Sequence, residues 1–163
     1  MSDPQSARAA EGSAPVDAPF DLMPLPRLPP LTRREKLELV VEILRIYVPA
    51  RVRLRRDNLR TMAELARRDP RVTLDLEPSQ AAALAIRLGK AVVRTLMLLP
   101  TDSRCLIRSL VLLRLLARRG IESTLVIGVR YEDQPFAAHA WIEHQQIPLL
   151  ATGGGSFARL LEI

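Results

Sequence analysis

The chain has 163 residues, a formal net charge of +6 and a single cysteine, Cys105. Hydrophobic residues make up 48% of the sequence, which is enough for the core of one ordinary domain. One cysteine excludes an intramolecular disulfide and a cysteine-rich zinc site, and it suits a reducing compartment. The N-terminus has no signal-peptide pattern, and the most apolar run, residues 91–99, is far shorter than the roughly 20 residues of a membrane span. We therefore expect a cytoplasmic protein with no membrane span.

Arginine supplies almost all of the positive charge, because the chain has 22 Arg and only two Lys. These arginines are spread over several predicted helices, so they give only the generic electrostatic footprint of a nucleic-acid-binding protein. The same charge would also attract anionic lipid or an acidic peptide. We expect no nucleic-acid partner, and we assign no cofactor and no metal from the residue pattern.

Residues 1–31 contain seven of the thirteen prolines and show no periodic apolar pattern. This composition is typical of a disordered or extended segment. Within it, residues 22–30 mix Leu with Pro and favour polyproline II, which could serve as a ligand for a groove or simply as a linker. The folded part is expected to begin at residue 32.

Apolar periodicity predicts four helices after the proline-rich segment. Thr32 and Glu35 form a capping box at the start of the first, and Pro49 is expected to end it near residue 48. The other three are predicted over residues 52–68, 78–98 and 104–119. Gly120 suits the left-handed position that closes the last helix. The apolar residues of the first helix recur at helical spacing: Leu37, Val40, Val41, Leu44 and Tyr47.

After residue 123 the sequence becomes rich in β-branched residues and turn residues. This pattern predicts antiparallel strands over residues 124–131, 137–144, 147–151 and 157–163. In the second strand, His139, Trp141 and Glu143 share one face because side chains alternate along a strand. The predicted fold class is α+β, with a helical N-terminal part over residues 32–77 that precedes a helix and a small antiparallel sheet.

Cys105 and His139 are the candidate catalytic residues. Cys105 falls in the first turn of the last predicted helix, where free backbone N–H groups and the helix dipole stabilise a thiolate. His139 lies on a strand, and a strand packed across the start of that helix would bring imidazole to sulfur. The imidazole could then take the thiol proton and later give a proton to a leaving amine. Each residue alone is commonly a core residue, so the prediction depends on the pair.

Four segments around this pair follow one another in a distinctive order. They are CLIRSL at residues 105–110, LLARRG at 115–120, VIGV at 126–129 and PFAAHAWIE at 135–143. In order and spacing they are similar to the lasso-peptide B2 leader peptidases, and the resemblance covers about half the chain. It implies a transglutaminase-like, papain-related core over residues 78–163, with Cys105 as the nucleophile and His139 as its base.

The resemblance also implies a substrate and partners. The substrate would be the precursor of a ribosomally made, modified peptide, whose leader is removed by hydrolysis. A separate ATP-using macrocyclase would then act on the core peptide. Family members carry a winged-helix domain that binds the leader through a β-hairpin, or they use a separate small protein for this purpose. Because residues 1–77 predict no hairpin, we expect a separate leader-recognition protein.

The sequence departs from the family at the third member of the catalytic triad. An Asp commonly follows the His by about a dozen residues in this family and orients the imidazole. Residues 147–152 contain no carboxylate here. Glu143 lies roughly 13 Å along the strand from His139, and Asp133 falls in the preceding turn, so neither is expected to orient the ring. Three candidates remain for this role: Thr152, Gln146 and a backbone carbonyl.

The missing carboxylate keeps two alternatives open. The chain could be an inactive binding or regulatory module with the same fold, or an enzyme that transfers its acyl group instead of hydrolysing it. The Cys105 backbone N–H is the expected first donor of an oxyanion hole, and the second donor is not assigned. Strand alternation turns His144 away from His139 and predicts a surface residue. Trp141 is interpreted as a core residue that could also shield the pair from water.

Overall fold

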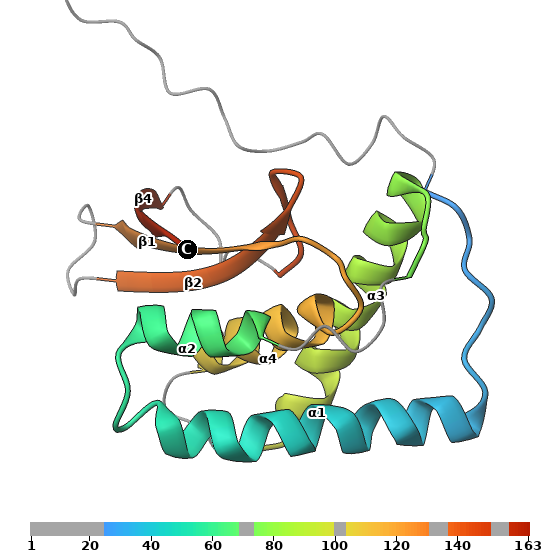
Figure 1. The fold of residues 1–163 in the computed structure, drawn as a ribbon, viewed down its shortest axis with the longest axis horizontal. Helices are drawn as coiled ribbons and strands as arrows, with labels where there is room; N and C mark the ends of the chain where they lie inside the picture. Colours follow the sequence, from blue (N-terminus) through green and yellow to red (C-terminus); the bar gives the residue numbers. More distant parts are fainter. Residues whose placement is uncertain (1–24, 69–73, 100–103, 131–136, 151–156) are drawn as a thin grey trace, which may run out of the picture.

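The structure is a computed structural model that describes residues 25–68, 74–99, 104–130, 137–150 and 157–163. Helices and a small antiparallel sheet make up these residues, which confirms the predicted α+β class (Figure 1). The helices are α1 (Arg33–Arg53), α2 (Leu59–Arg67), α3 (Pro78–Leu96) and α4 (Arg104–Ala117). The strands are β1 (Thr124–Arg130), β2 (Ala137–His144), β3 (Ile147–Pro148) and β4 (Ala158–Glu162).

Helix α4 lies at the centre of the core, where it contacts the other three helices and strands β1 and β2. In Figure 1 the sheet lies above α2 and α4, and α1 crosses beneath them. The helix ends as predicted, because Gly120 has a φ of 70° and takes the left-handed conformation that favours glycine. Its buried apolar side chains belong to one continuous core: Ile107, Leu110, Val111, Leu112, Leu113, Leu115 and Leu116.

Helix α1 begins at the predicted capping box. The Thr32 hydroxyl accepts the Glu35 backbone N–H, and the Glu35 carboxylate accepts the Thr32 N–H at 2.7 Å, which lowers the pKa of Glu35. The prediction that Pro49 ends this helix is wrong, because α1 continues to Arg53. Proline removes one backbone donor from a helix, and here Ala50 and Leu54 pack against the core beyond it, which outweighs that local loss.

The inward face of α1 is also partly different from the predicted one. Ile43 and Tyr47 are buried, whereas Leu37 and Val41 remain 65% and 37% exposed. The predicted set mixed two neighbouring stripes of the helix, because apolar residues occur on both. One stripe faces the core, and the other leaves an exposed apolar surface on α1.

The second predicted helix is shorter in the structure and begins at Leu59. Residues 52 and 53 still belong to α1, and a turn follows before Asn58 caps α2 by accepting the Thr61 backbone N–H at 2.8 Å. Asparagine is among the preferred helix N-cap residues. The Asp57-Asn58 pair was therefore the available signal for this boundary.

The sheet has the strand order β3-β2-β1-β4, and all of its pairs are antiparallel. Strand β3 is shorter than predicted, because the chain bends after Pro148 and buries Leu149 and Leu150 in the core. The Leu149 N–H still donates to the Ile142 carbonyl of β2 at 2.8 Å. A two-residue turn joins β2 to β3, and both of its residues, Gln145 and Gln146, have positive φ. Residues 132–135 and 153–155, which connect predicted strands, lie outside the described residues.

Among the residues that the structure describes, no helix is both long enough and apolar enough to cross a membrane.

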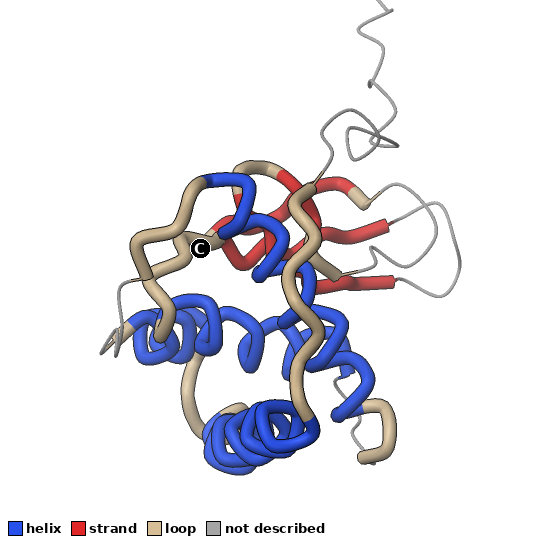
Figure 2. The backbone as a smooth tube through the Cα atoms, turned by 90° about the vertical axis from the view of Figure 1, so that its right-hand side faces the viewer, coloured by secondary structure: helices blue, strands red, loops and turns tan. Residues whose placement is uncertain are grey.

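The end of the proline-rich segment packs on the helices, while residues 1–24 lie outside the described residues. Residues 25–32 form neither helix nor strand and lead into α1, as the tan tube in Figure 2 shows. Four residues of this stretch line a cavity of about 490 Å³ with α1 and α3: Leu25, Pro26, Leu28 and Leu31.

We predict that the chain without residues 1–30 has a free energy of unfolding about 1–2 kcal/mol lower than the chain without residues 1–24. The loss reflects the half-buried Leu25 and Leu28 side chains. Urea denaturation of both truncated chains, followed by circular dichroism, measures the difference. Equal stability of the two chains would show that residues 25–30 contribute nothing to the core.

Candidate functional site

The start of α4 positions Cys105. The helix begins at Arg104, so Cys105 lies in the first turn, as predicted. The thiol is half-buried. Backbone N–H groups in the first turn of a helix have no partner within the helix and favour an anion beside them. The residues that precede the helix, at positions 100–103, lie outside the described residues.

Strand β2 is held against this helix by the peptide groups of Ala140. The buried Ser109 hydroxyl donates a hydrogen bond to the Ala140 carbonyl at 3.0 Å. The Ala140 N–H donates to the Cys105 sulfur, as does the Leu106 N–H. Cys105 and Ser109 are one helical turn apart, so one face of α4 binds both polar groups of a single strand residue. This arrangement fixes where β2 crosses the helix.

The next residue along the strand brings the predicted pair together. His139 precedes Ala140, and its imidazole forms a hydrogen bond with the Cys105 side chain. This bond is the main cause that lowers the pKa of Cys105 from its ordinary value of 9.0 to about 7, with the two N–H donors acting in the same direction and burial acting against them. A substantial fraction of the thiol is therefore ionised near neutral pH, and a thiolate is the reactive form of cysteine.

Two aromatic rings hold the His139 ring. Trp141, two residues along the same face of β2, stacks on it with a centroid distance of 6.1 Å and an interplanar angle of 20°. Phe157 approaches at 5.5 Å and 35°. Gly128, opposite His139 on β1, makes room for these rings, because a Cβ atom there would lie 2.8 Å from both Phe157 and Trp141.

The indole is fixed in turn by Glu143. The Trp141 Nε1–H donates to Glu143 Oε1 at 2.8 Å, and Arg159 from β4 forms an ion pair with the same oxygen at 2.9 Å. Glu143 is buried, and this pairing satisfies the rule that buried charges have partners. A chain of contacts therefore runs from Arg159 through Glu143 and Trp141 to the imidazole.

The structure places the other polar candidates as follows. Gln146 lies in the turn at the far end of β2 from His139, which removes it as a group that orients the ring. Thr152 and Asp133 lie outside the described residues.

The prediction that His144 is a surface residue is wrong, because it is only 6% exposed. It points away from His139 as expected, but the chain before β1 covers it, and its Nδ1 contacts the Glu122 carbonyl at 2.7 Å.

Three residues of this network were not identified from the sequence: Ser109, Phe157 and Arg159. Ser109 carried a signal, because it lies four residues after Cys105 on the same helix face. Phe157 and Arg159 carried none, since their role depends on β4 pairing with β1, with Arg159 opposite Gly128. Side-chain pairs across strands are invisible until the register is known.

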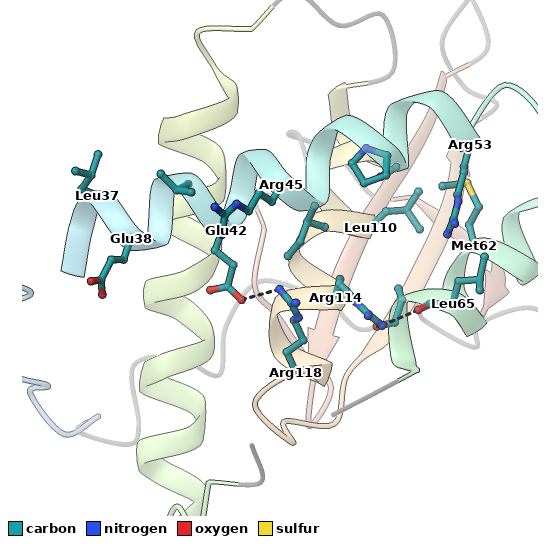
Figure 3. Close-up of a pocket in the computed structure, with 15 residues that line it drawn as sticks. Leu37, Glu38, Glu42, Arg45, Arg53, Met62, Leu65, Leu110, Arg114 and Arg118 are labelled. Carbon is teal, nitrogen blue, oxygen red and sulfur yellow. Dashed lines mark hydrogen bonds and ion pairs between the residues drawn. The ribbon is translucent and has the colours of Figure 1, made fainter. Parts of the chain in front are cut away.

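A large cavity lies elsewhere, in the groove between α1, α2 and α4 that Figure 3 shows. Its volume is about 860 Å³, and neither Cys105 nor His139 lines it. In the described part of the chain, no three His, Cys, Asp or Glu side chains are grouped so that they could hold a metal ion.

The chain belongs to the transglutaminase-like superfamily, whose family model matches residues 44–162. The match begins within α1 and extends through β4, so it includes the helix that carries Cys105 and the strand that carries His139. No curated protein and no solved structure matches the chain.

We predict that alkylation of Cys105 by iodoacetamide has a pH midpoint near 7, because the reaction follows the thiolate fraction. Replacement of His139 by Ala should move the midpoint upward, since burial alone raises a thiol pKa. His144→Gln is the matched control and should leave the midpoint in place. An unchanged midpoint in His139→Ala would contradict the hydrogen bond between the two side chains.

The same thiol links stability to pH. Because folding lowers its pKa, its stabilising contribution is complete above the unfolded value near 9 and is lost as the pH falls through about 7.

We also predict that Glu143→Ala raises the pH midpoint of Cys105 alkylation and lowers the free energy of unfolding by about 1–3 kcal/mol, because the buried indole N–H loses its acceptor. Glu162→Ala is the control, since it removes the other carboxylate that pairs with Arg159 and leaves Trp141 untouched. Alkylation profiles and urea denaturation measure both effects. Identical profiles for the two variants would show that Glu143 does not act on His139 through Trp141.

Proposed function

We propose that this chain is a cysteine peptidase that removes the leader from a ribosomally synthesised precursor peptide of the lasso type. In this proposal Cys105 is the nucleophile and His139 is its general base. The hydrogen bond between the two side chains, together with the pKa of about 7 for Cys105, is the observation that supports it most directly. Membership of the transglutaminase-like superfamily is consistent with this chemistry.

The proposed reaction has two steps. The Cys105 thiolate attacks the carbonyl carbon of the scissile peptide bond, and the proton held by His139 passes to the leaving amine, which is the N-terminus of the core peptide. The leader remains as a thioester on Cys105. A water molecule, deprotonated by His139, then attacks the thioester, releases the leader as a carboxylic acid and regenerates the thiol.

The substrate class is supported by the sequence segments at residues 105–110, 115–120, 126–129 and 135–143, which resemble the lasso-peptide B2 leader peptidases. The released core peptide would pass to a separate macrocyclase. A free thiol nucleophile suits a reducing compartment, so we propose that the reaction takes place in the cytoplasm.

An inactive transglutaminase-like module in the same pathway is the second candidate. It is favoured by one observation, namely that residues 147–152 contain no carboxylate where the resembling enzymes commonly have an Asp. Such a module would bind the precursor and leave it intact. Mass spectrometry of a precursor incubated with the chain distinguishes the two functions.

We predict that Cys105→Ala abolishes cleavage of the precursor peptide and leaves the helical content unchanged, because alanine fits the first turn of a helix and only the nucleophile is lost. Product masses and far-ultraviolet circular dichroism are the two measurements. Cleavage at the normal rate by the Cys105→Ala chain would exclude Cys105 as the nucleophile.

We further propose that a separate leader-recognition protein presents the substrate. Between residues 25 and 99, the described part of the chain forms helices α1, α2 and α3 and contributes no strand edge to which a leader could add. Addition of a leader as an extra strand is a common mode of peptide recognition. In this proposal the leader is held by another protein near Cys105.

This proposal predicts that the cognate recognition protein raises kcat/KM for precursor cleavage by about 10- to 100-fold, because tethering raises the effective concentration of the scissile bond. Cleavage rates with and without that protein, at equal enzyme concentration, provide the test. A precursor that lacks its leader-binding segment is the control and should show no increase. Full-rate cleavage by the isolated chain would contradict the need for a partner.

A further inference from the structure

The groove between α1, α2 and α4 has an apolar floor and a positively charged rim. Met62 and Ala66 from α2 and Leu110 from α4 are buried at its base. One wall is helix α1, which runs along the top of the groove in Figure 3. A volume of about 860 Å³ is large enough for several side chains of a bound partner.

One ridge of the α1 wall consists of residues spaced four apart, the spacing at which one helix interdigitates with another. The residues of this ridge are Leu37, Val41, Arg45, Pro49 and Arg53. A second row lies beside it: Glu38, Glu42, Ile46 and Ala50. Beside the first ridge, Val48 and Val52 are 59% and 53% exposed, and within it Leu37 is 65% exposed. Helix α1 therefore presents exposed apolar side chains, Leu37, Val41, Val48 and Val52, that no other described part of the chain covers.

Some charged side chains that line the groove have partners, and others have none among the described residues. Glu42 is paired with Arg118 at 3.1 Å and with Arg119 at 2.8 Å, and Glu38 is paired with Arg34. Arg114 is also engaged, because it donates to the Leu65, Ala66 and Arg68 carbonyls at the end of α2. No other residue that the structure describes forms a hydrogen bond or ion pair with the guanidinium group of Arg45 or Arg53, and both residues are exposed. The groove is left with two available cations.

We propose that this groove binds an acidic amphipathic helix of a partner protein. Arg45 and Arg53 are eight residues apart on one helix, which places them about 12 Å from each other along its axis. Two carboxylates seven or eight residues apart on the partner helix have the same spacing. The apolar residues of that helix would pack against Leu37 and Val41, as in other helix-in-groove complexes.

The groove and the Cys105 site occupy different faces of α4. Arg114 follows Cys105 by nine residues, or two and a half helical turns, so the two side chains leave the helix on opposite sides. A helix bound in the groove would not contact Cys105 or His139. The proposal of a helix-binding groove therefore does not depend on the peptidase function, and each can be tested without the other.

The test uses two 18-residue helical peptides with Leu at positions i, i+4, i+7 and i+11. One has Glu pairs seven residues apart beside this stripe, and the other has Gln at the same positions. Fluorescence anisotropy with the full chain, at physiological ionic strength, should show at least tenfold tighter binding of the Glu peptide. Arg45→Glu/Arg53→Glu and Val41→Asp should each weaken that binding at least tenfold.

Arg56→Glu/Arg60→Glu is the matched control, because it makes the same change in net charge at exposed positions outside the groove. It should leave binding within twofold, and all variants should retain the Cys105 alkylation profile. Equal loss in the control would reduce the binding to general attraction by a basic surface, and no effect of Val41→Asp would exclude the apolar groove. A dimer of the free chain that Val41→Asp dissociates would show that a second copy occupies the face. Each of these three results would overturn the proposal.

Discussion

The hydrogen bond from Ser109 to the Ala140 carbonyl is the constraint on which the site depends. It joins the buried face of α4 to one residue of β2, and the N–H of that same residue reaches the Cys105 sulfur. Since a buried carbonyl without a partner costs about 1–3 kcal/mol, a shift of the strand by one residue is disfavoured. Such a shift would also turn His139 to the other face of the sheet. Together with the pairing of β2 with β1, this bond sets the position of the imidazole.

The remaining contacts refine this arrangement with groups from distant parts of the chain. Stacking by Trp141 and Phe157 restricts the plane of the His139 ring, and Glu143 restrains the indole. These interactions fix the position of the ring, whereas its hydrogen bond to Cys105 lowers the pKa of the thiol. Polar contacts and packing therefore act on the same side chain, which is the arrangement expected of a preorganised site. The groove on the far side of α4 leaves this arrangement intact.

Local sequence patterns were sufficient for the parts of the fold that depend on local physics. The capping box at Thr32, the glycine at the end of α4 and the position of Cys105 in a first helical turn follow from residues within a few positions of one another. Pro49 shows where this reasoning fails, because packing beyond it keeps the helix intact. The prediction that His144 is exposed failed for a related reason. Strand alternation gives the direction of its side chain but cannot show that the chain at Glu122 covers it. The contacts of β4 depend on how it pairs with β1, so they could not be predicted from the sequence.

The proposed mechanism requires a covalent thioester between the leader and Cys105, and its detection is the most direct test. The chain is mixed with its precursor peptide, quenched in acid within the first turnovers, and its intact mass is measured. We predict a species heavier by the mass of the leader minus one water molecule, located at Cys105 by peptide mapping and abolished by hydroxylamine. Cleavage without such an adduct, or an adduct that persists in Cys105→Ala, would contradict the central role of this thiol.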